Sequence, residues 1–350
     1  MKKVIFVTPN LTNGGAERVT AILANELAIQ GFSVEIVFMK DSQTVYELNN
    51  FVKTFMFFSN GNRIYRIISK ILKLRKLMKK NIDATFIAML PFETFYIYLA
   101  GMGLHCKIVY SLRNDPANMN SLLEKYIKKR IYAKAYRIVF QTEQARNYFP
   151  QNIRKKGIII PNPINDEIPE RFIGKRRKEI VTVGRLKKQK NYPLLLRAFS
   201  NVYQKYPDWK LRIFGQGILE PELKQLCKDL GISKGVEFCG FVSNVTEKIN
   251  QSGMFVLSSD YEGISNAMLE ALATGLPCIC TDCPAGGARM MIKDHENGIL
   301  VPVRNEQKLS EAMLELIENP MLAERLSKNA VNIKHIWSVQ KVSEEWRQVL

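Results

Sequence analysis

The chain has 350 residues, which is enough for about two domains that each bury a core, and its 46% hydrophobic and 24% charged content is that of a globular protein. The net charge is +18, and residues 1–165 hold most of it, with 25 Lys and Arg against 10 Asp and Glu. The most apolar stretch, Phe86 to Leu104, is interrupted by Pro91 and Glu93, so no membrane span is predicted.

The first ten residues have a basic start, but polar residues soon cut the apolar run short. We therefore expect the first strand of a cytoplasmic enzyme and not a signal peptide. Two interpretations are open for Cys278, Cys280 and Cys283: they bind a metal, or they are thiols buried in the core. Strand alternation favours thiols in the core, no fourth ligand is evident because His295 lies in a turn, and reduced cysteines fit the cytosol.

Residues 3–8 alternate as a strand, and Asn13, Gly14 and Gly15 then open a helix that ends near Gly31. A strand, a glycine turn and a helix N-terminus favour an anion, although a tight turn without any ligand has the same pattern. The turn is neither the dinucleotide fingerprint nor a P-loop, which argues against a nicotinamide oxidoreductase.

After strands at 33–39 and 52–57, residues 61–81 form a basic amphipathic helix. One arc holds Ile64, Ile67, Ile68, Ile71, Leu74 and Met78, and another holds Arg63, Arg66, Lys70, Lys73, Lys76 and Lys80. The helix can simply pack on a sheet with its charges solvated. Because no acid interrupts these cations, an anionic partner is favoured.

Strands follow at 84–89, 107–110 and 137–141, with a polar turn at 111–116 that contains Arg113. Two prolines in the segment 158–163 suit a hinge after the first domain. The basic run 174–178 is interpreted as a solvated interdomain loop in preference to a nucleic-acid patch.

The second domain begins with a strand at 180–183, and the next residues include Gly184, Arg185, Lys190 and Asn191. A cationic loop at the carboxyl end of a strand suits a diphosphate. A strand at 210–215 ends in Gly215, and a strand at 236–240 leads into a turn with Phe241 and Val242.

The stretch 255–287 reads as a strand, a polar turn with Glu262, a helix with Glu270 and a second strand. Its ligand crevice is expected at the carboxyl end of the first strand, where a carboxylate can bind a ribose diol. From the spacing alone, Glu262 could equally be an ordinary acid in a loop and Glu270 an exposed residue of a helix.

The segment EGISNAMLEALATGLPCI resembles the Glu-x7-Glu signature of retaining, nucleotide-sugar-dependent glycosyltransferases of family 4, which have the GT-B fold. The resemblance extends to GGAER at 14–18, to the PNP turn at 161–163 and to the G-R-x4-K-N pattern at 184–191. It implies two doubly wound α/β domains that face one another across a cleft. The predicted domains are 1–165 for the acceptor and 166–336 for the nucleotide sugar, with a helix in 337–350 returning to the first.

The resemblance also implies roles for particular residues. Arg185 and Lys190 would bind the diphosphate and stabilise its departure, and Glu262 would contact the donor sugar. The remaining donor contacts would be Gly14, Gly15, Gly184, Gly215, Phe241, Val242, Gly263, Ile264, Ser265, Asn266 and Glu270. Many relatives have a histidine at or near the position of Arg113, but an arginine cannot act as a base there, so we expect Arg113 to hold an anion. The cations that would bind a polyprenyl diphosphate acceptor are Arg63, Arg66, Lys70 and Lys73.

We therefore expect retaining transfer from a nucleotide sugar, with uridine as the expected base, to a lipid-linked or polysaccharide acceptor in bacterial cell-surface glycan synthesis. No metal or other cofactor is expected, since Asp-x-Asp is absent and cations and helix termini can replace a metal. The enzyme would associate peripherally with the inner face of the membrane and would bind no nucleic acid. A sugar-nucleotide epimerase of similar shape and a basic nucleic-acid-binding protein are the alternatives.

Overall fold

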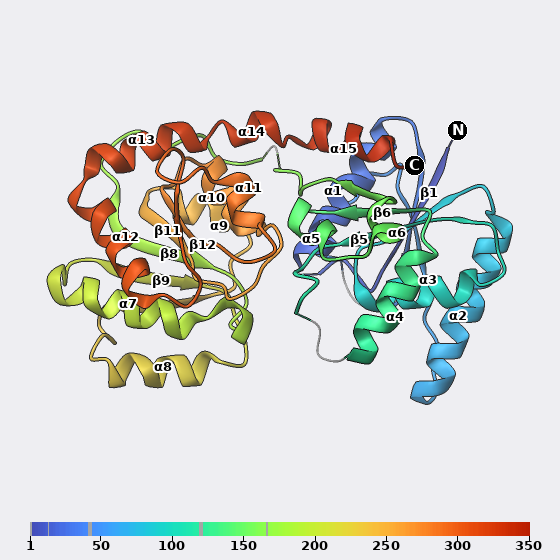
Figure 1. Ribbon diagram of the computed structural model, residues 1–350, viewed down its shortest axis with the longest axis horizontal. Coiled ribbons are helices and arrows are strands. Elements are labelled where there is room, and N and C mark those ends of the chain that lie inside the picture. The colour runs from blue at the N-terminus through green and yellow to red at the C-terminus, as the bar shows by residue number, and fades with distance from the viewer. Residues whose placement is uncertain (1, 13, 41–43, 119–121, 166) are drawn as a thin grey trace. The chain divides into compact units, whose positions relative to one another are not determined.

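The computed structural model describes residues 2–350 apart from 13, 41–43, 119–121 and 166. Asn13, in the predicted glycine turn, and Asp166, the first residue of the second predicted domain, lie outside the described residues. The chain divides into two compact units, one formed by Met1–Pro163 with Val339–Leu350 and the other by Ile164–Ser338. Each unit is drawn with its helices and strands in Figure 1.

Unit 1 is a parallel sheet covered by helices. The order β3-β2-β1-β4-β5-β6-β7 joins seven described strands. The strands are β1 Lys3–Thr8, β2 Ser33–Phe38, β3 Lys53–Met56, β4 Thr85–Ala88, β5 Lys107–Leu112, β6 Arg137–Phe140 and β7 Gly157–Ile159. The helices are α1 Gly15–Ile29, α2 Arg63–Lys80, α3 Pro91–Gly101, α4 Leu122–Ala133, α5 Glu143–Asn147, α6 Gln151–Arg154 and α15 Val339–Arg347.

The central strands β1, β4, β5 and β6 are buried over most of their length and mainly apolar, because helices cover both faces of the sheet. In β1, Ile5 and Val7 join the core beneath α2, α3 and α4, whereas Val4 and Phe6 alternate to the other face. Helix α1 contacts α15, which brings the red C-terminal helix beside the blue N-terminal one in Figure 1.

Unit 2 repeats the plan with six described strands in the order β10-β9-β8-β11-β12-β13. The strands are β8 Arg177–Val183, β9 Lys210–Phe214, β10 Val236–Gly240, β11 Ser252–Leu257, β12 Cys278–Thr281 and β13 Ile299–Val301. The helices are the 3₁₀ turn η1 Lys188–Lys190, α7 Tyr192–Lys205, α8 Glu220–Asp229, α9 Val245–Ile249, α10 Asn266–Ala273, α11 Gly287–Met291, α12 Glu306–Glu318, α13 Pro320–Ala330 and α14 Ile333–Ile336.

Two cores flank the six-stranded sheet. Residues of α7, α8, α12 and α13 fill one core, and residues of α9, α10, α11 and α14 fill the other. Helices therefore cover both faces of a parallel sheet, and this confirms the predicted doubly wound α/β class. Cys278 and Cys280 are fully buried in the second core, as the strand alternation predicted.

The structure differs from the sequence prediction at three places. Strand β5 continues to Leu112, so the predicted turn at 111–116 begins later. Strand β8 begins at Arg177, and Arg176 donates to the carbonyls of Asn250, Ser252 and Gly275, so the run 174–178 is not simply a solvated loop. Buried carbonyls without partners are costly, and Arg176 satisfies three of them.

The third difference concerns α2. Its predicted apolar arc is only partly buried: Leu74 and Met78 lie in the core, whereas Ile64 is 70% exposed and Ile68 is 51% exposed. The amino-terminal half of this helix thus presents isoleucines and cations together. No helix in the described part of the chain is long and apolar enough to cross a bilayer.

Candidate active site

The predicted donor residues of unit 2 gather at one edge of the six-stranded sheet. Strands β8 and β11 are neighbours, while β9 and β10 extend the sheet on one side and β12 and β13 on the other. Their carboxyl ends form the topological switch point, where open parallel sheets bind ligands. The loop 184–191 follows β8 and the loop 258–266 follows β11, so adjacency of two strands brings together segments far apart in sequence.

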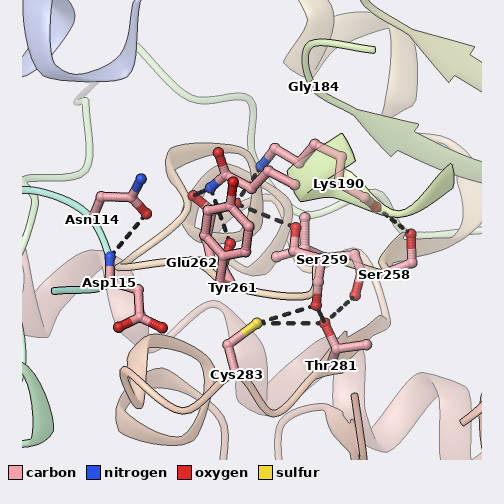
Figure 2. A network of polar contacts seen from close by, with 12 residues as sticks. Asn114, Asp115, Gly184, Lys190, Ser258, Ser259, Tyr261, Glu262, Thr281 and Cys283 are labelled. Atoms are coloured by element: carbon pink, nitrogen blue, oxygen red, sulfur yellow. Dashed lines mark hydrogen bonds and ion pairs between the residues drawn. The ribbon is translucent and has the colours of Figure 1, made fainter. Parts of the chain in front are cut away.

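Lys190 and Glu262 form the centre of this edge, as Figure 2 shows. The Lys190 Nζ lies 2.5 Å from Glu262 Oε2, and each side chain is 16% exposed. Gln189 Nε2 donates to Glu262 Oε1 at 3.2 Å, and Ser259 Oγ donates to Oε2 at 3.3 Å. The carboxylate is therefore held by three donors, and two of the three predicted catalytic residues are brought into direct contact.

Further bonds fix the two loops to one another. Ser258 Oγ donates to the Lys190 carbonyl at 2.9 Å, and the backbone N–H of Asp260 donates to the Gln189 carbonyl at 2.9 Å. Asn191 lies in the left-handed region with φ 43°, and its Nδ2 donates to Asp260 Oδ1 at 2.7 Å. The loop conformation thus depends on an asparagine, which tolerates this backbone region better than most residues.

Glycines let backbone segments approach closely at this edge. Gly215 has φ +139°, and a Cβ there would lie 2.0 Å from the Gly184 carbonyl oxygen. A Cβ on Gly287 would lie 1.8 Å from the Gly263 carbonyl oxygen, which joins the turn after β11 to the start of α11. Substituting either glycine would require the backbone to move.

The other predicted donor residues occupy the same edge. Ile264 and Ser265 are buried, Ser265 is the N-cap of α10, and Asn266 is its first residue. Backbone N–H groups at such a helix start favour an anion. Glu270 lies one turn further on and is 8% exposed, which supports the prediction that it is not a surface residue. Phe241 and Val242 follow β10, with Phe241 exposed.

Arg185, the third predicted catalytic residue, differs from Lys190 in its surroundings. It follows β8 directly and is exposed. Within the described residues it forms no ion pair and no side-chain hydrogen bond, so its guanidinium is available to an anionic ligand. An arginine fork matches the geometry of phosphate oxygens.

The predicted residues of unit 1 lie at the carboxyl edge of the seven-stranded sheet. Gly14 is the N-cap of α1 and Gly15 its first residue. Arg113 follows β5, and its Nη1 donates to Asn162 Oδ1 in the PNP turn, while its guanidinium lies 5.6 Å from the ring of Trp346. Burial lowers the pKa of Arg113 to about 9, and Nε and Nη2 have no hydrogen-bond partner among the described residues.

The four predicted cations of α2 do not form one group. Arg63 and Arg66 are exposed on the first turns, and Lys70 is half-buried. Lys73 Nζ instead donates to the Phe58 carbonyl and to Ser59 Oγ at 3.2 Å, so it anchors α2 to the segment after β3.

The sequence prediction missed the residues that hold the site together, chiefly Gln189, Ser259 and Asp260. Their signal was present, because polar residues that directly follow a buried strand lie at the carboxyl edge. For a metal, the described residues offer no group of three or more His, Cys, Asp or Glu side chains in suitable positions.

Two family models match the chain. Residues 164–332 match the family described as Glycosyl transferases group 1, and residues 13–168 match Glycosyltransferase Family 4. The first match contains every predicted residue of the unit 2 site.

Relatives match over nearly the whole chain. The N-acetylgalactosamine-N,N'-diacetylbacillosaminyl-diphospho-undecaprenol 4-alpha-N-acetylgalactosaminyltransferase of Campylobacter jejuni is 31% identical over 92% of both chains. An uncharacterized glycosyltransferase of Haemophilus influenzae is 29% identical over 100% of both chains.

Solved structures show the same fold. TarM of S. aureus, solved as a mutant with UDP and other ligands, superposes with a TM-score of 0.84 at 14% identity over 100% of this chain and 99% of its own. HepE of Anabaena, in complex with UDP and glucose, superposes with a TM-score of 0.83 at 16% identity over 99% of both. The chain therefore belongs to the group 1 glycosyltransferases of family 4, and it is a glycosyltransferase with the GT-B fold.

Proposed function

We propose that this glycosyltransferase moves a sugar from a UDP-linked donor, with retention of configuration, to a hydroxyl of a lipid-diphosphate-linked glycan at a membrane surface. The proposal of a UDP-linked donor is supported by the carboxyl edge of the unit 2 sheet, where exposed Arg185 and the Lys190–Glu262 pair lie beside the N-terminus of α10. Cations and helix N–H groups suit a diphosphate, and carboxylates suit sugar hydroxyls.

Catalysis in this proposal comes from stabilising the leaving group. The bond between the anomeric carbon and the phosphate oxygen breaks, and the diphosphate keeps the electron pair. The acceptor hydroxyl oxygen forms the new bond to the anomeric carbon from the same face, and its proton passes to the departing diphosphate. Arg185 and Lys190 then face more negative charge than in the bound donor, so their interaction strengthens toward the transition state. Glu262 and Glu270 accept hydrogen bonds from donor hydroxyls, and no divalent metal is required.

The proposal of a lipid-diphosphate-linked acceptor is supported by the charge of unit 1 and by the names of two relatives. Residues 1–165 carry a net charge of +15, and α2 exposes Arg63 and Arg66 beside Ile64 and Ile68. A helix with basic and apolar groups exposed together suits an anionic lipid surface. The names of two Campylobacter jejuni relatives specify acceptors linked to diphospho-undecaprenol or PP-undecaprenol.

The test is a screen of radiolabelled UDP-sugars with lipid extracted from native membranes as acceptor, in the presence of EDTA. We expect label to enter the lipid fraction with one donor, and UDP to appear only when lipid is added. Interconversion of the donor sugar without lipid would instead identify an epimerase. Loss of transfer in EDTA that is restored by a divalent metal would overturn the metal-independent part.

The retaining outcome is tested on the product of that screen. Proton NMR coupling constants at the new anomeric centre are expected to show the same configuration as the donor sugar. The opposite configuration would reject retention and leave the transfer activity standing.

A further inference from the structure

The carboxyl edge of the seven-stranded sheet has a switch point of its own. Strands β2 and β3 lie on one side of β1, and β4 to β7 lie on the other. Helix α1 begins after β1 and α3 begins after β4, so two helix N-termini flank the position where open parallel sheets bind ligands. The donor residues discussed above belong mainly to unit 2, and the acidic groups at this second switch point have no ligand assigned to them.

Glu93, the third residue of α3, is buried at this edge with only 3% of its surface exposed. Carboxylates are rarely buried without a partner, because removing the charge from water is costly. In the part of the chain that the structure describes, Glu93 forms no ion pair and no bond to another side chain. The one hydrogen bond that acts on its pKa comes from its own backbone N–H.

Three charged side chains from three other segments influence the Glu93 carboxyl. Glu17 belongs to α1, Lys40 follows β2 and Lys70 belongs to α2, and all three act electrostatically on the Glu93 carboxyl. Among the described residues, neither Lys40 nor Lys70 has its nitrogen within 4.0 Å of a Glu93 carboxylate oxygen, so neither forms an ion pair with it. The three groups thus influence the Glu93 carboxyl electrostatically, and among the described residues no side chain forms a hydrogen bond to it.

From this arrangement we infer that Glu93 is a specificity-determining residue that binds sugar hydroxyls of the acceptor glycan, while Lys40 and Lys70 hold the diphosphate of its carrier. The inference rests on the proposed function and assigns its acceptor subsite. A buried carboxylate whose only donor is its own backbone N–H selects ligands that bring hydroxyl donors, since an acceptor lacking them leaves the charge poorly satisfied. The charged form makes the stronger bonds to hydroxyls.

The subsite has a characteristic pH dependence. Burial, reinforced by Glu17, raises the pKa of Glu93 to about 7, although Lys40, Lys70 and the backbone N–H oppose the rise. On the same helix, Tyr96 also lies within the electrostatic influence of Glu93. Affinity for a hydroxylated acceptor should therefore increase as pH rises through 7 and the carboxyl loses its proton.

The experiment compares two probes by calorimetric titration of the full chain at pH 6 and pH 8. One probe is farnesyl diphosphate carrying a single N-acetylgalactosamine, and the other is farnesyl diphosphate alone, which corrects for titration of the diphosphate. The variants are Glu93→Gln and, as a matched control, Asp83→Asn, an exposed acid of the same unit. A thermal melt of each variant verifies folding.

For the parent we expect the sugar-bearing probe to bind more tightly than the plain probe, with a preference that grows by roughly tenfold from pH 6 to pH 8. Asp83→Asn should behave like the parent, whereas Glu93→Gln should bind both probes alike at both pH values. A folded Glu93→Gln protein that keeps the preference and its pH dependence would overturn the inference alone. A parent that binds neither probe would overturn the lipid-diphosphate acceptor of the proposed function as well.

Discussion

At the scale of single residues, the Lys190–Glu262 pair shows how the protein fixes a cation at the proposed donor site. The ammonium group has three N–H donors, and one of them is directed to Glu262 at 2.5 Å. Because Gln189 and Ser259 also hold the carboxylate, the position of the Lys190 ammonium group is fixed by neighbouring side chains. In the proposed reaction, a cation held in this way stabilises the leaving diphosphate without reorganising, which is the main source of electrostatic catalysis.

Arg185 provides the sharpest test of the donor site. Since it has no side-chain partner among the described residues, Arg185→Ala should leave the melting temperature unchanged. We expect turnover to fall by about a hundredfold or more, the usual effect of losing one group that stabilises a developing anion. The measurement is kcat with the UDP-sugar identified in the screen. Lys187→Ala, an exposed cation two residues away, is the control and should retain parental turnover; equal turnover in both variants would reject the role of Arg185.

Glu93 also makes a prediction about stability. Its pKa is about 7 in the folded chain and 4.5 in the absence of burial, so folding favours the protonated form. The free energy of unfolding therefore keeps the full contribution of the protonated Glu93 below pH 4.5. It falls by on the order of 3 kcal/mol as pH rises from 4.5 through 7. We expect Glu93→Gln to be more stable than the parent at pH 8 and close to it at pH 5, as measured by urea unfolding. An equal difference at both pH values would contradict a buried, titrating carboxyl.

These residues show what the sequence could predict about the site and what it could not. Arg185, Lys190 and Glu262 follow apolar strands with glycine turns, and that pattern alone places them at a carboxyl edge. The bonds that Gln189 and Asn191 make depend on which strands are neighbours, and a single sequence does not state the strand order. Glu93 entered the sequence analysis only as an interruption of an apolar stretch, because burial of one acid depends on the packing of several elements.

At the scale of elements, α2 divides into two halves with different environments. Asn62 caps the helix by accepting from the Tyr65 N–H at 2.8 Å, and Leu74 and Met78 fix the far half in the core. The 3.6-residue period correctly predicted the helix. It also placed the apolar residues on one arc, but it could not show how much of that arc is buried, because periodicity gives the direction of a side chain and not whether a neighbour covers it.

The two halves should respond differently to substitution. Replacing Ile64, Ile68 and Leu72, all exposed, by serine should leave stability nearly unchanged and abolish binding to anionic vesicles. Leu74→Ala, in the buried half, should instead lower the free energy of unfolding by about 2–5 kcal/mol and leave vesicle binding of the folded protein intact. Vesicle flotation and urea unfolding measure the two effects. Undiminished flotation of the triple serine variant would exclude the amino-terminal half of α2 as a membrane contact.

At the scale of the whole molecule, the chain consists of two units that differ in charge and in chemistry. The doubly wound class was predictable because apolar runs alternate with helical periods along the entire sequence. The return of the last helix to unit 1 followed only from the family resemblance. In the structure, Trp346 of α15 is fully buried and lies against Arg113, which bonds the PNP turn at Asn162.

This division predicts that the two units respond to different perturbations. Trp346→Ala removes a fully buried side chain and should destabilise unit 1 by about 3–5 kcal/mol. UDP at a hundred times its dissociation constant should stabilise unit 2 by about 2.7 kcal/mol, because it binds the folded site only. Calorimetry should accordingly show two transitions, with Trp346→Ala lowering one and UDP raising the other.

The control for the UDP effect is Glu270→Gln, which keeps the shape of a buried side chain in α10 and removes its charge. If Glu270 binds the ribose hydroxyls, this variant should need more UDP for the same shift, and the transition lowered by Trp346→Ala should not move. A shift as large as that of the parent would remove Glu270 from the nucleotide site. If UDP raised the transition that Trp346→Ala lowers, nucleotide binding would have to be assigned to the seven-stranded unit, contrary to the donor site derived from the loops after β8 and β11.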